Sequence, residues 1–265
     1  FSEATKLNGV IRIITADDIP GDRFVGLIFK DWPLMIKPGE TTRYIGDVLA
    51  GVVAETEDIA RKAVKLIKVT YDVHKPVTNP HQAIKPGAVK VHPDRDNLLE
   101  TCRVYRGGDA GEILAHSGFI AKGIYQTQRI EHAFLETEGA VAMPFEDGVH
   151  LYSNGQGIYE DRKQVAAVLS LPLEKVRVTL VSTGGGFGGK EDMTVQGHAA
   201  LFAWLLDKPV KLVLSRDESI RMHPKRHPVY MNMEVGCDKN GKLTGLKLYA
   251  VGDSGAYASV GTKVM

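Results

Sequence analysis

A glycine-rich segment, residues 182–192, constrains this chain more than any other feature. It reads Ser-Thr-Gly-Gly-Gly-Phe-Gly-Gly-Lys-Glu-Asp and lies between the apolar run 176–181 and the Ala- and Leu-rich run 197–206. This order predicts a strand, a tight loop and a helix. Glycine allows positive φ and close approach of the backbone to a neighbour, and N–H groups at a helix N-terminus bind anions. The segment therefore predicts a loop that grips a negatively charged group at short range.

Two nucleotide-binding explanations of this loop meet obstacles in the sequence. The GxGxxG dinucleotide pattern is present, but the acidic residue expected about twenty positions later would be Asp207, in a helix-ending loop. The GxxxxGK phosphate-loop pattern is present as well. Glu191 and Asp192 follow it, however, where a Ser or Thr should bind Mg²⁺. Two carboxylates at that point would repel a triphosphate.

Two further explanations stay open at this point. A bulky anionic cofactor could lie against the loop backbone, with Phe187 as a flat apolar contact and Glu191 facing a substrate pocket. Alternatively, the glycines serve only the close packing of a helix on a strand. The density of glycine and the charged residues after it favour the cofactor.

Composition limits the class of protein. The chain has 265 residues, more than one domain usually contains, with 43% hydrophobic and 25% charged residues as in ordinary globular proteins. The net charge of +1 provides no field that would recruit nucleic acid or an anionic membrane. The longest apolar run, 199–206, is too short to cross a bilayer. Cys102 and Cys237 are too few for a disulfide framework or an iron–sulfur cluster, so a cytoplasmic location is expected.

Hydrophobic periodicity predicts alternating strands and helices. Strands are predicted at 10–15, 47–54, 68–73, 118–128, 139–143, 149–152, 176–181, 210–214, 229–235 and 243–251. Helices are predicted at 59–67, with an N-cap at Thr56, at 157–169 and at 192–206, the last of them apolar on nearly every side and therefore buried. A hairpin turn is predicted at 238–241 and a proline-rich linker at 75–97. The chain opens on Phe1 rather than Met and stops without a closing element, so we expect a piece of a longer polypeptide or a processed subunit.

Several motifs together resemble one family, the molybdenum hydroxylases that include xanthine dehydrogenase and aldehyde oxidase. Residues 184–191, Gly-Gly-Gly-Phe-Gly-Gly-Lys-Glu, resemble the glycine motif of this family. The segments 13–20 and 44–56 are similar to its small N-terminal hammerhead domain. Further motifs agree in the order of the family: residues 130–137, 226–228 and 252–257.

The resemblance implies an α+β chain with two parts. Residues 1–95 would be a hammerhead-type α/β domain, incomplete at its N-terminus, together with the linker. Residues 96–265 would be the first part of a mixed α+β domain that binds the molybdopterin cofactor.

The resemblance also implies roles for individual residues. Gln156 matches the glutamine that hydrogen-bonds an oxygen on the metal, and the backbone at Gly186, Phe187 and Gly188 matches the positions that approach the cofactor. Glu191 matches a glutamate that faces the substrate in xanthine-type enzymes and that aldehyde-type relatives often lack. The resemblance implies no direct molybdenum ligand among these residues, and the general-base glutamate is expected beyond Met265.

The implied activity is oxidative hydroxylation of a purine, similar to xanthine, or of another N-heterocycle, with water as the oxygen source. The implied cofactor is molybdopterin carrying molybdenum, in the cytosine dinucleotide form typical of bacterial members. An iron–sulfur subunit, a flavin (FAD) subunit and the rest of the molybdopterin-binding subunit would be the partners. Aldehyde oxidation by a member of the same family is the alternative, as is a non-catalytic scaffold that lacks the second half of the site.

Other polar residues favour structural roles. His223 and His227 have the spacing of a helical metal site, but Pro224 and Pro228 follow them and prevent a shared helical face. In a strand at 131–138, Glu136 and Glu138 would lie on one side and Glu131 on the other, which favours hydrogen bonding over metal ligation. The basic residues of helix 59–67 indicate a solvated surface.

Overall fold

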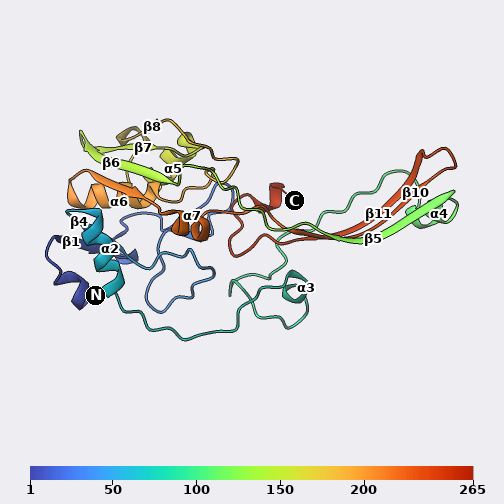
Figure 1. Cartoon of the computed structure of the whole chain (residues 1–265), viewed down its shortest axis with the longest axis horizontal. Helices are drawn as coiled ribbons and strands as arrows, with labels where there is room; N and C mark the ends of the chain where they lie inside the picture. The colour runs from blue at the N-terminus through green and yellow to red at the C-terminus, as the bar shows by residue number, and fades with distance from the viewer. Residues whose placement is uncertain (265) are drawn as a thin grey trace. The chain divides into compact units, whose positions relative to one another are not determined.

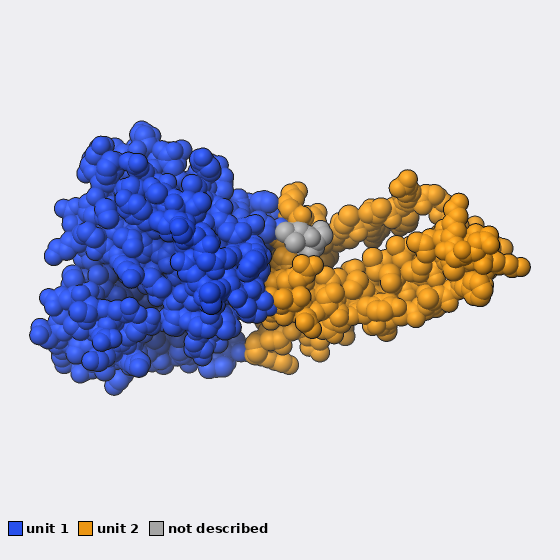
Figure 2. Space-filling model, turned by 45° about the horizontal axis from the view of Figure 1, so that its top comes forward, with its two compact units in different colours: residues 1–74, 131–224, 257–260 blue, residues 75–130, 225–256, 261–265 orange. Residues whose placement is uncertain are grey.

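The computed structural model describes residues 1–264, which form two compact units, each assembled from separate segments (Figures 1 and 2). Unit 1 contains residues 1–74, 131–224 and 257–260. Unit 2 contains residues 75–130, 225–256 and the residues from Gly261 onward. The two predicted domains are continuous ranges that meet at residue 95, whereas each of these units combines separate segments that contact one another. The predicted domain boundary stays a prediction.

The centre of unit 1 is a four-stranded sheet in the order β8-β7-β6-β9. Its strands are β6 (Gly139–Phe145), β7 (Gly148–Ser153), β8 (Val176–Leu180) and β9 (Val210–Val213). Only β7 and β8 are parallel, because α5 (Ile158–Leu169) and the 3₁₀ helix η2 (Leu173–Lys175) connect them as a crossover. Strand β9 instead pairs antiparallel with β6, which is not the arrangement of a dinucleotide-binding sheet.

Helix α6 (Gln196–Leu206) packs against this sheet and against α5, and its first eight residues are buried. Leu151 of β7, Val165 of α5 and Leu201 of α6 are completely buried in one shared core. A helix without a polar face needs apolar neighbours on several sides, and this helix has them. The burial that its composition predicts is therefore confirmed.

The N-terminal segment of unit 1 joins the same core. Strand β1 (Val10–Ile14) pairs antiparallel with β4 (Gly51–Ala54), and α2 (Glu57–Leu66) lies over the pair. The hydroxyl of Thr56 accepts the Ile59 N–H at 3.3 Å, which confirms the predicted helix cap. The remaining short elements of this segment are α1 (Ser2–Thr5), η1 (Ala16–Asp18), β2 (Phe24–Val25) and β3 (Trp32–Pro33).

Unit 2 is an open three-stranded antiparallel sheet in the order β11-β10-β5. Its elements are β5 (Phe119–Gln126), β10 (Val229–Cys237), β11 (Leu243–Gly252), α3 (Pro80–Ala83), α4 (Ala110–Ala115) and α8 (Gly261–Val264). The predicted hairpin turn is confirmed, because Asp238 Oδ1 accepts the N–H groups of Asn240 at 2.8 Å and Lys242 at 3.0 Å. Helix α7 (Arg216–Met222) completes the helices and belongs to unit 1.

The α+β class is confirmed, but some predicted elements are wrong. Residues 68–73 form no strand, because no neighbouring strand pairs with them, and Tyr71 and Val73 are exposed. Residues 131–138 are also irregular. The strand predicted from residue 47 begins only at Gly51, and the helix predicted from residue 192 begins at Gln196. Within residues 1–264, no helix combines the length and apolar character needed to cross a membrane.

Candidate cofactor-binding site

The glycine loop leaves β8 at Leu180 and reaches α6 at Gln196 through backbone that favours glycine. Gly185 and Gly188 have φ values of 95° and 87°, in the left-handed region that other residues rarely adopt. Phe187 lies between them with φ 54° and a side chain that is 73% exposed. A large apolar residue in this conformation costs about 1 kcal/mol or more, so the loop must be held from outside.

Gln156 holds the loop. Its side-chain oxygen Oε1 accepts the N–H of Gly188 at 3.0 Å and the N–H of Lys190 at 3.2 Å, and its backbone N–H donates to the Lys190 carbonyl at 2.8 Å. A Cβ on Gly186 would lie 2.4 Å from Gln156 Oε1, so a larger residue there would displace the Gln156 side chain from this position. The structure thus brings together Gln156, Gly186, Phe187 and Gly188, the residues nominated for cofactor binding, while that role stays a prediction.

These bonds also fix the orientation of the Gln156 amide. Both loop N–H groups require an acceptor, so Oε1 must face the loop. The exposed side chain of Gln156 then offers Nε2, which is an N–H donor, to a ligand. The loop backbone and the Gln156 side chain form one preorganised unit.

A buried hydrogen-bond network lies behind the Gln156 turn. The Ser153 hydroxyl accepts N–H groups from Gly155 at 3.0 Å and from Gln196 Nε2 at 3.2 Å, and it donates to Asp161 Oδ2 at 3.3 Å. Burial raises the pKa of Asp161 to about 7, against the lowering effect of the Ser153 bond. A Cβ on Gly155 would lie 2.8 Å from Gln196 Nε2. The turn that carries Gln156 therefore rests on a closely packed polar support.

Glu136 fixes the first residue of the loop. Its Oε2 accepts the Gly184 N–H at 2.7 Å, and its backbone N–H donates to the Gly184 carbonyl at 3.2 Å. The bond from Gly184 lowers the pKa of Glu136, despite an opposing effect of burial. The loop is thus anchored at its start by Glu136 and at its end by Gln156.

Lys190 points into the protein instead of toward a ligand. Its side chain is buried, with Nζ 3.6 Å from Glu136 Oε2 and 4.7 Å from the centroid of the Phe134 ring. Burial lowers the pKa of Lys190. The phosphate-loop explanation requires this ammonium group to reach a phosphate, so the structure argues against it.

The glycine loop does not lead directly into the N-terminus of the following helix, and the binding of an anion by the loop stays a prediction. Residues 192–195 separate the glycine loop from α6 and are buried. Asp192 accepts a hydrogen bond from the Ser259 hydroxyl, and burial raises its pKa. The neighbouring Glu191 is exposed at the exit of the loop, and its role toward a substrate stays a prediction.

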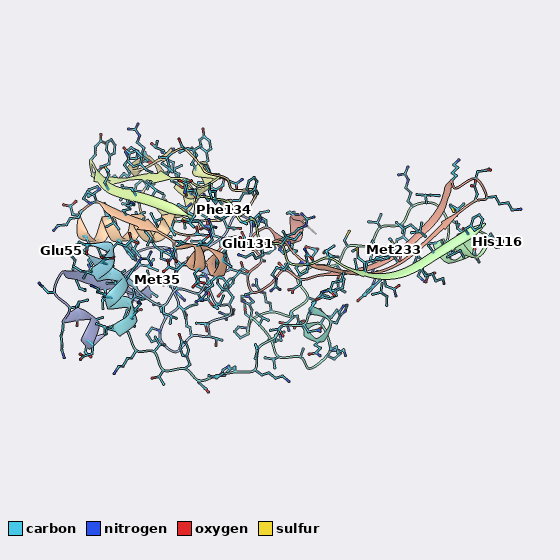
Figure 3. The ribbon with its side chains drawn as sticks, in the orientation of Figure 1. Met35, Glu55, His116, Glu131, Phe134 and Met233 are labelled. Atoms are coloured by element: carbon cyan, nitrogen blue, oxygen red, sulfur yellow. The ribbon has the colours of Figure 1, made fainter. Side chains whose placement is uncertain are left out.

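Sequence reasoning considered the polar residues Glu131, His132, Glu136 and Glu138 of segment 131–138 and, separately, His223, but missed the contact between them. His223 Nε2 lies 2.8 Å from Glu131 Oε1, and His223 Nδ1 lies 3.1 Å from Glu138 Oε1. The strand expected here would have separated Glu131 from Glu138. In the folded chain both carboxylates face the same histidine (Glu131 and Phe134 are labelled in Figure 3). No local pattern in the sequence predicts this convergence, because it depends on tertiary structure.

Comparison with known proteins decides the family. Residues 91–265 match the Molybdopterin cofactor-binding domain family, and residues 1–75 match the Aldehyde oxidase and xanthine dehydrogenase, a/b hammerhead domain family. The chain belongs to the molybdenum hydroxylases. Among molybdenum hydroxylases, a probable xanthine dehydrogenase subunit of Bacillus subtilis is 37% identical over 99% of this chain. The large molybdopterin subunit of nicotinate dehydrogenase from Eubacterium barkeri is 33% identical over 100% of it.

Solved structures of molybdenum hydroxylases share the fold. The aldehyde oxidoreductase of Desulfovibrio gigas superposes with a TM-score of 0.87 at 25% identity, over 95% of this chain and 29% of that chain. Quinoline 2-oxidoreductase of Pseudomonas putida 86 superposes with a TM-score of 0.82 at 25% identity, over 97% of this chain and 34% of that chain. The chain spans 35% of the Bacillus relative and 62% of the Eubacterium relative.

The residues of the loop fit the cofactor of the family. The Gln156 amide is held so that it presents a donor, and the loop tip presents the exposed Phe187 beside glycines with positive φ. Glycine at 186 permits the contact with Gln156 that maintains this arrangement. Lys190 faces inward, so we assign it no contact with the cofactor phosphate.

Proposed function

We propose that this chain supplies the Gln156 side of the active site of a molybdenum hydroxylase acting on a purine or another N-heterocycle. One observation carries the proposal: Gln156 Oε1 accepts two N–H groups of the glycine loop at 3.0 and 3.2 Å. This contact makes the glutamine and the loop a single rigid element, as a site that positions a metal cofactor requires.

In this proposal, Gln156 Nε2 and the backbone at Gly186, Phe187 and Gly188 hold molybdopterin. The cofactor, when bound, supplies the two-electron redox chemistry of hydroxylation with water as the oxygen source. The chain contributes an oriented N–H donor from Gln156 and a loop that does not reorganise during the reaction. Phe187, whose side chain is exposed at the loop tip, would exclude water from a cofactor bound against the loop.

Glu191 supports a heterocyclic substrate in preference to an aldehyde. Its carboxylate is exposed at the loop exit and can accept a hydrogen bond from a ring N–H. An aldehyde has no such donor and gains nothing from this contact. Curated relatives of the chain include proteins named for xanthine and for nicotinate, which are both heterocycles.

The aldehyde alternative keeps a specific observation in its favour. The fold matches the aldehyde oxidoreductase of Desulfovibrio gigas with a TM-score of 0.87. A non-catalytic scaffold is a further alternative. We propose, from the family, that the cofactor is the cytosine dinucleotide form and that iron–sulfur and FAD subunits are partners; the relatives named as subunits support a multi-subunit assembly.

A substrate panel with the purified full-length protein tests this function. Xanthine, nicotinate and benzaldehyde are supplied in H₂¹⁸O, and products are analysed by mass spectrometry alongside the molybdenum content. We expect ¹⁸O in a hydroxylated heterocycle and a loss of at least about 10-fold in kcat/KM for Glu191→Ala, with aldehyde turnover unchanged. Faster aldehyde turnover that is insensitive to Glu191→Ala would support the aldehyde alternative, and protein without molybdenum or turnover would support a scaffold.

A further inference from the structure

We propose that Glu131, His132 and His223 form a binding site for a divalent cation of the zinc type. One ligand atom from each residue lies within 4.8 Å of the others, and all three residues belong to unit 1. Two imidazoles and one carboxylate are a ligand set that zinc binds, with water in the fourth position. The inference concerns an ion distinct from the molybdenum cofactor and does not rest on the proposed function.

His223 is positioned as metal-ligating histidines are. It ends helix α7, where its N–H donates to the Ser219 carbonyl at 3.2 Å, and its side chain is completely buried. Its Nδ1 lies 3.1 Å from Glu138 Oε1, and its Nε2 is directed to Glu131. A histidine that binds a metal through one nitrogen usually donates the other N–H to a carboxylate. Glu138 is this carboxylate, so its contact orients His223 for ligation through Nε2.

The ion would lie between His223 Nε2 and Glu131 Oε1. These atoms are 2.8 Å apart, so a modest separation admits a cation with bonds of about 2.0–2.2 Å to each. The neighbouring residues Glu131 and His132 then supply two ligands from one short segment. Between them and Phe134, Ala133 has φ 50°, a conformation that the surrounding structure must maintain.

The local charges favour a cation. Three carboxylates lie in this part of unit 1: Glu131 and Glu138 contact His223, and Glu136 lies 3.6 Å from Lys190 Nζ. Two basic groups oppose them: Lys190 Nζ lies 4.7 Å and Arg216 Cζ 5.8 Å from the centroid of the Phe134 ring. With neutral histidines, this set leaves an excess of one negative charge. An ion-free cluster, in which His223 contacts both carboxylates directly, is the competing arrangement, and zinc binding distinguishes the two.

The position of the cluster indicates what the ion would do. A Cβ on Gly189 would lie 2.9 Å from His132 Cγ and Nδ1, so the imidazole of His132 packs directly against the glycine loop. Fixing His132 to an ion would stiffen the surface on which this loop rests. We therefore infer a structural role for the ion behind the loop.

Zinc titration of the full-length protein tests the site. The protein is stripped with a chelator, and ZnCl₂ binding is followed by calorimetry, with zinc analysed separately from molybdenum and iron. We expect one zinc per chain at this site. Glu131→Gln and His132→Gln are each expected to weaken binding by about 100-fold. His74→Gln is the matched control, because His74 is an exposed histidine 3.4 Å from the carboxylate of Asp72 in the same unit, and it should leave binding unchanged.

Two further measurements allow the zinc site to be tested even if a variant fails to fold. Circular dichroism identifies such a variant, and X-ray absorption of the zinc-loaded wild-type protein then reports the ligands directly. A first shell with two imidazoles is expected. Absence of zinc binding, binding unchanged in folded Glu131→Gln and His132→Gln, or a first shell without imidazole would overturn the proposal and leave His223 as a direct structural partner of Glu131 and Glu138.

Discussion

The two units of this chain achieve order in different ways. Unit 1 buries a continuous apolar core in which Leu151, Val165 and Leu201 are inaccessible to solvent. In unit 2 the three strands are paired along their length, but Ile124 is 84% exposed and Leu248 is 49% exposed. Unit 1 is therefore stabilised by side-chain packing, and unit 2 mainly by backbone hydrogen bonds.

This difference explains where the candidate site lies. The glycine loop and Gln156 both belong to unit 1 and rest on buried groups, so their geometry is maintained by the core. Unit 2 presents apolar side chains that its own residues do not cover, which is typical of a surface that contacts other protein. The comparison gives three predictions on stability, ordered from the largest expected effect.

Asp161 should make unit 1 sensitive to pH in a way that unit 2 is not. Its ordinary pKa of 3.8 is raised to about 7, so the folded state binds a proton more tightly and the free energy of unfolding falls as pH rises from about 4 to about 7. Asp161→Asn should remove this decline. Above pH 7, the free energy of unfolding of this variant should exceed that of the wild type by up to about 4 kcal/mol. Both tryptophans, Trp32 and Trp204, lie in unit 1, so their fluorescence during urea unfolding reports this change.

Glu234 of unit 2 is the control for Asp161. It is partly exposed, and a hydrogen bond from Lys122 lowers its pKa, so its contribution to stability has the opposite sign and disappears as pH falls through the carboxylate range. Glu234→Gln should change amide exchange in β10 only slightly. A wild-type unfolding curve for unit 1 that is independent of pH between about 4 and 7 would contradict the account of Asp161.

Replacing a leucine by alanine should destabilise unit 1 more than unit 2. Leu201→Ala creates a cavity in the closed core and should lower the free energy of unfolding of unit 1 by about 3 kcal/mol. Leu248→Ala removes a half-exposed side chain and should lower the stability of the unit 2 sheet by less than about 1 kcal/mol. Hydrogen exchange of the strand amides measures both effects, and equal losses would show that unit 2 has a covered core after all.

Adding a methyl group at close contacts should have the smallest effects. A Cβ at Gly51 would lie 2.1 Å from Phe202 Cζ in the core of unit 1, and Gly51→Ala should cost about 2 kcal/mol. At Gly236, the Cβ would meet Ser117 Oγ at 2.4 Å and Leu114 Cδ2 at 2.9 Å, where α4 packs on the unit 2 sheet. These side-chain atoms can move, so Gly236→Ala should cost about 1 kcal/mol. Thermal melting compares the two, and the reverse order would be inconsistent with the packing described.

Local chemistry explains which elements the sequence predicted. The Thr56 cap and the Asp238 turn depend on residues a few positions apart, and both predictions are confirmed. The strand expected at 68–73 required a partner strand, about which its own alternation carries no information. A pattern confined to one segment determines a helix cap or a hairpin turn, but not strand pairing.

In the candidate site, too, local features could be predicted from the sequence, whereas contacts between distant residues could not. The glycines at 185 and 188 and the exposed Phe187 follow from the loop sequence and the family resemblance. The inward direction of Lys190 and the convergence of Glu131 and Glu138 on His223 do not, because residues far apart in the sequence create them. Neither the Asp161 network nor this cluster has a motif by which sequence reasoning could have found it.

The central claim is that the Gln156 amide is locked by the loop so that it presents a donor to the cofactor. Gln156→Glu tests it in the full-length protein, because a carboxylate still accepts the N–H groups of Gly188 and Lys190 but replaces the Nε2 donor with an acceptor. Gln82→Glu, on an exposed residue of unit 2, is the matched control. We predict a fall of about 100-fold in kcat for Gln156→Glu, with unchanged unfolding of unit 1 and wild-type turnover in the control. Wild-type turnover by a folded Gln156→Glu protein with its full molybdenum content would contradict the account.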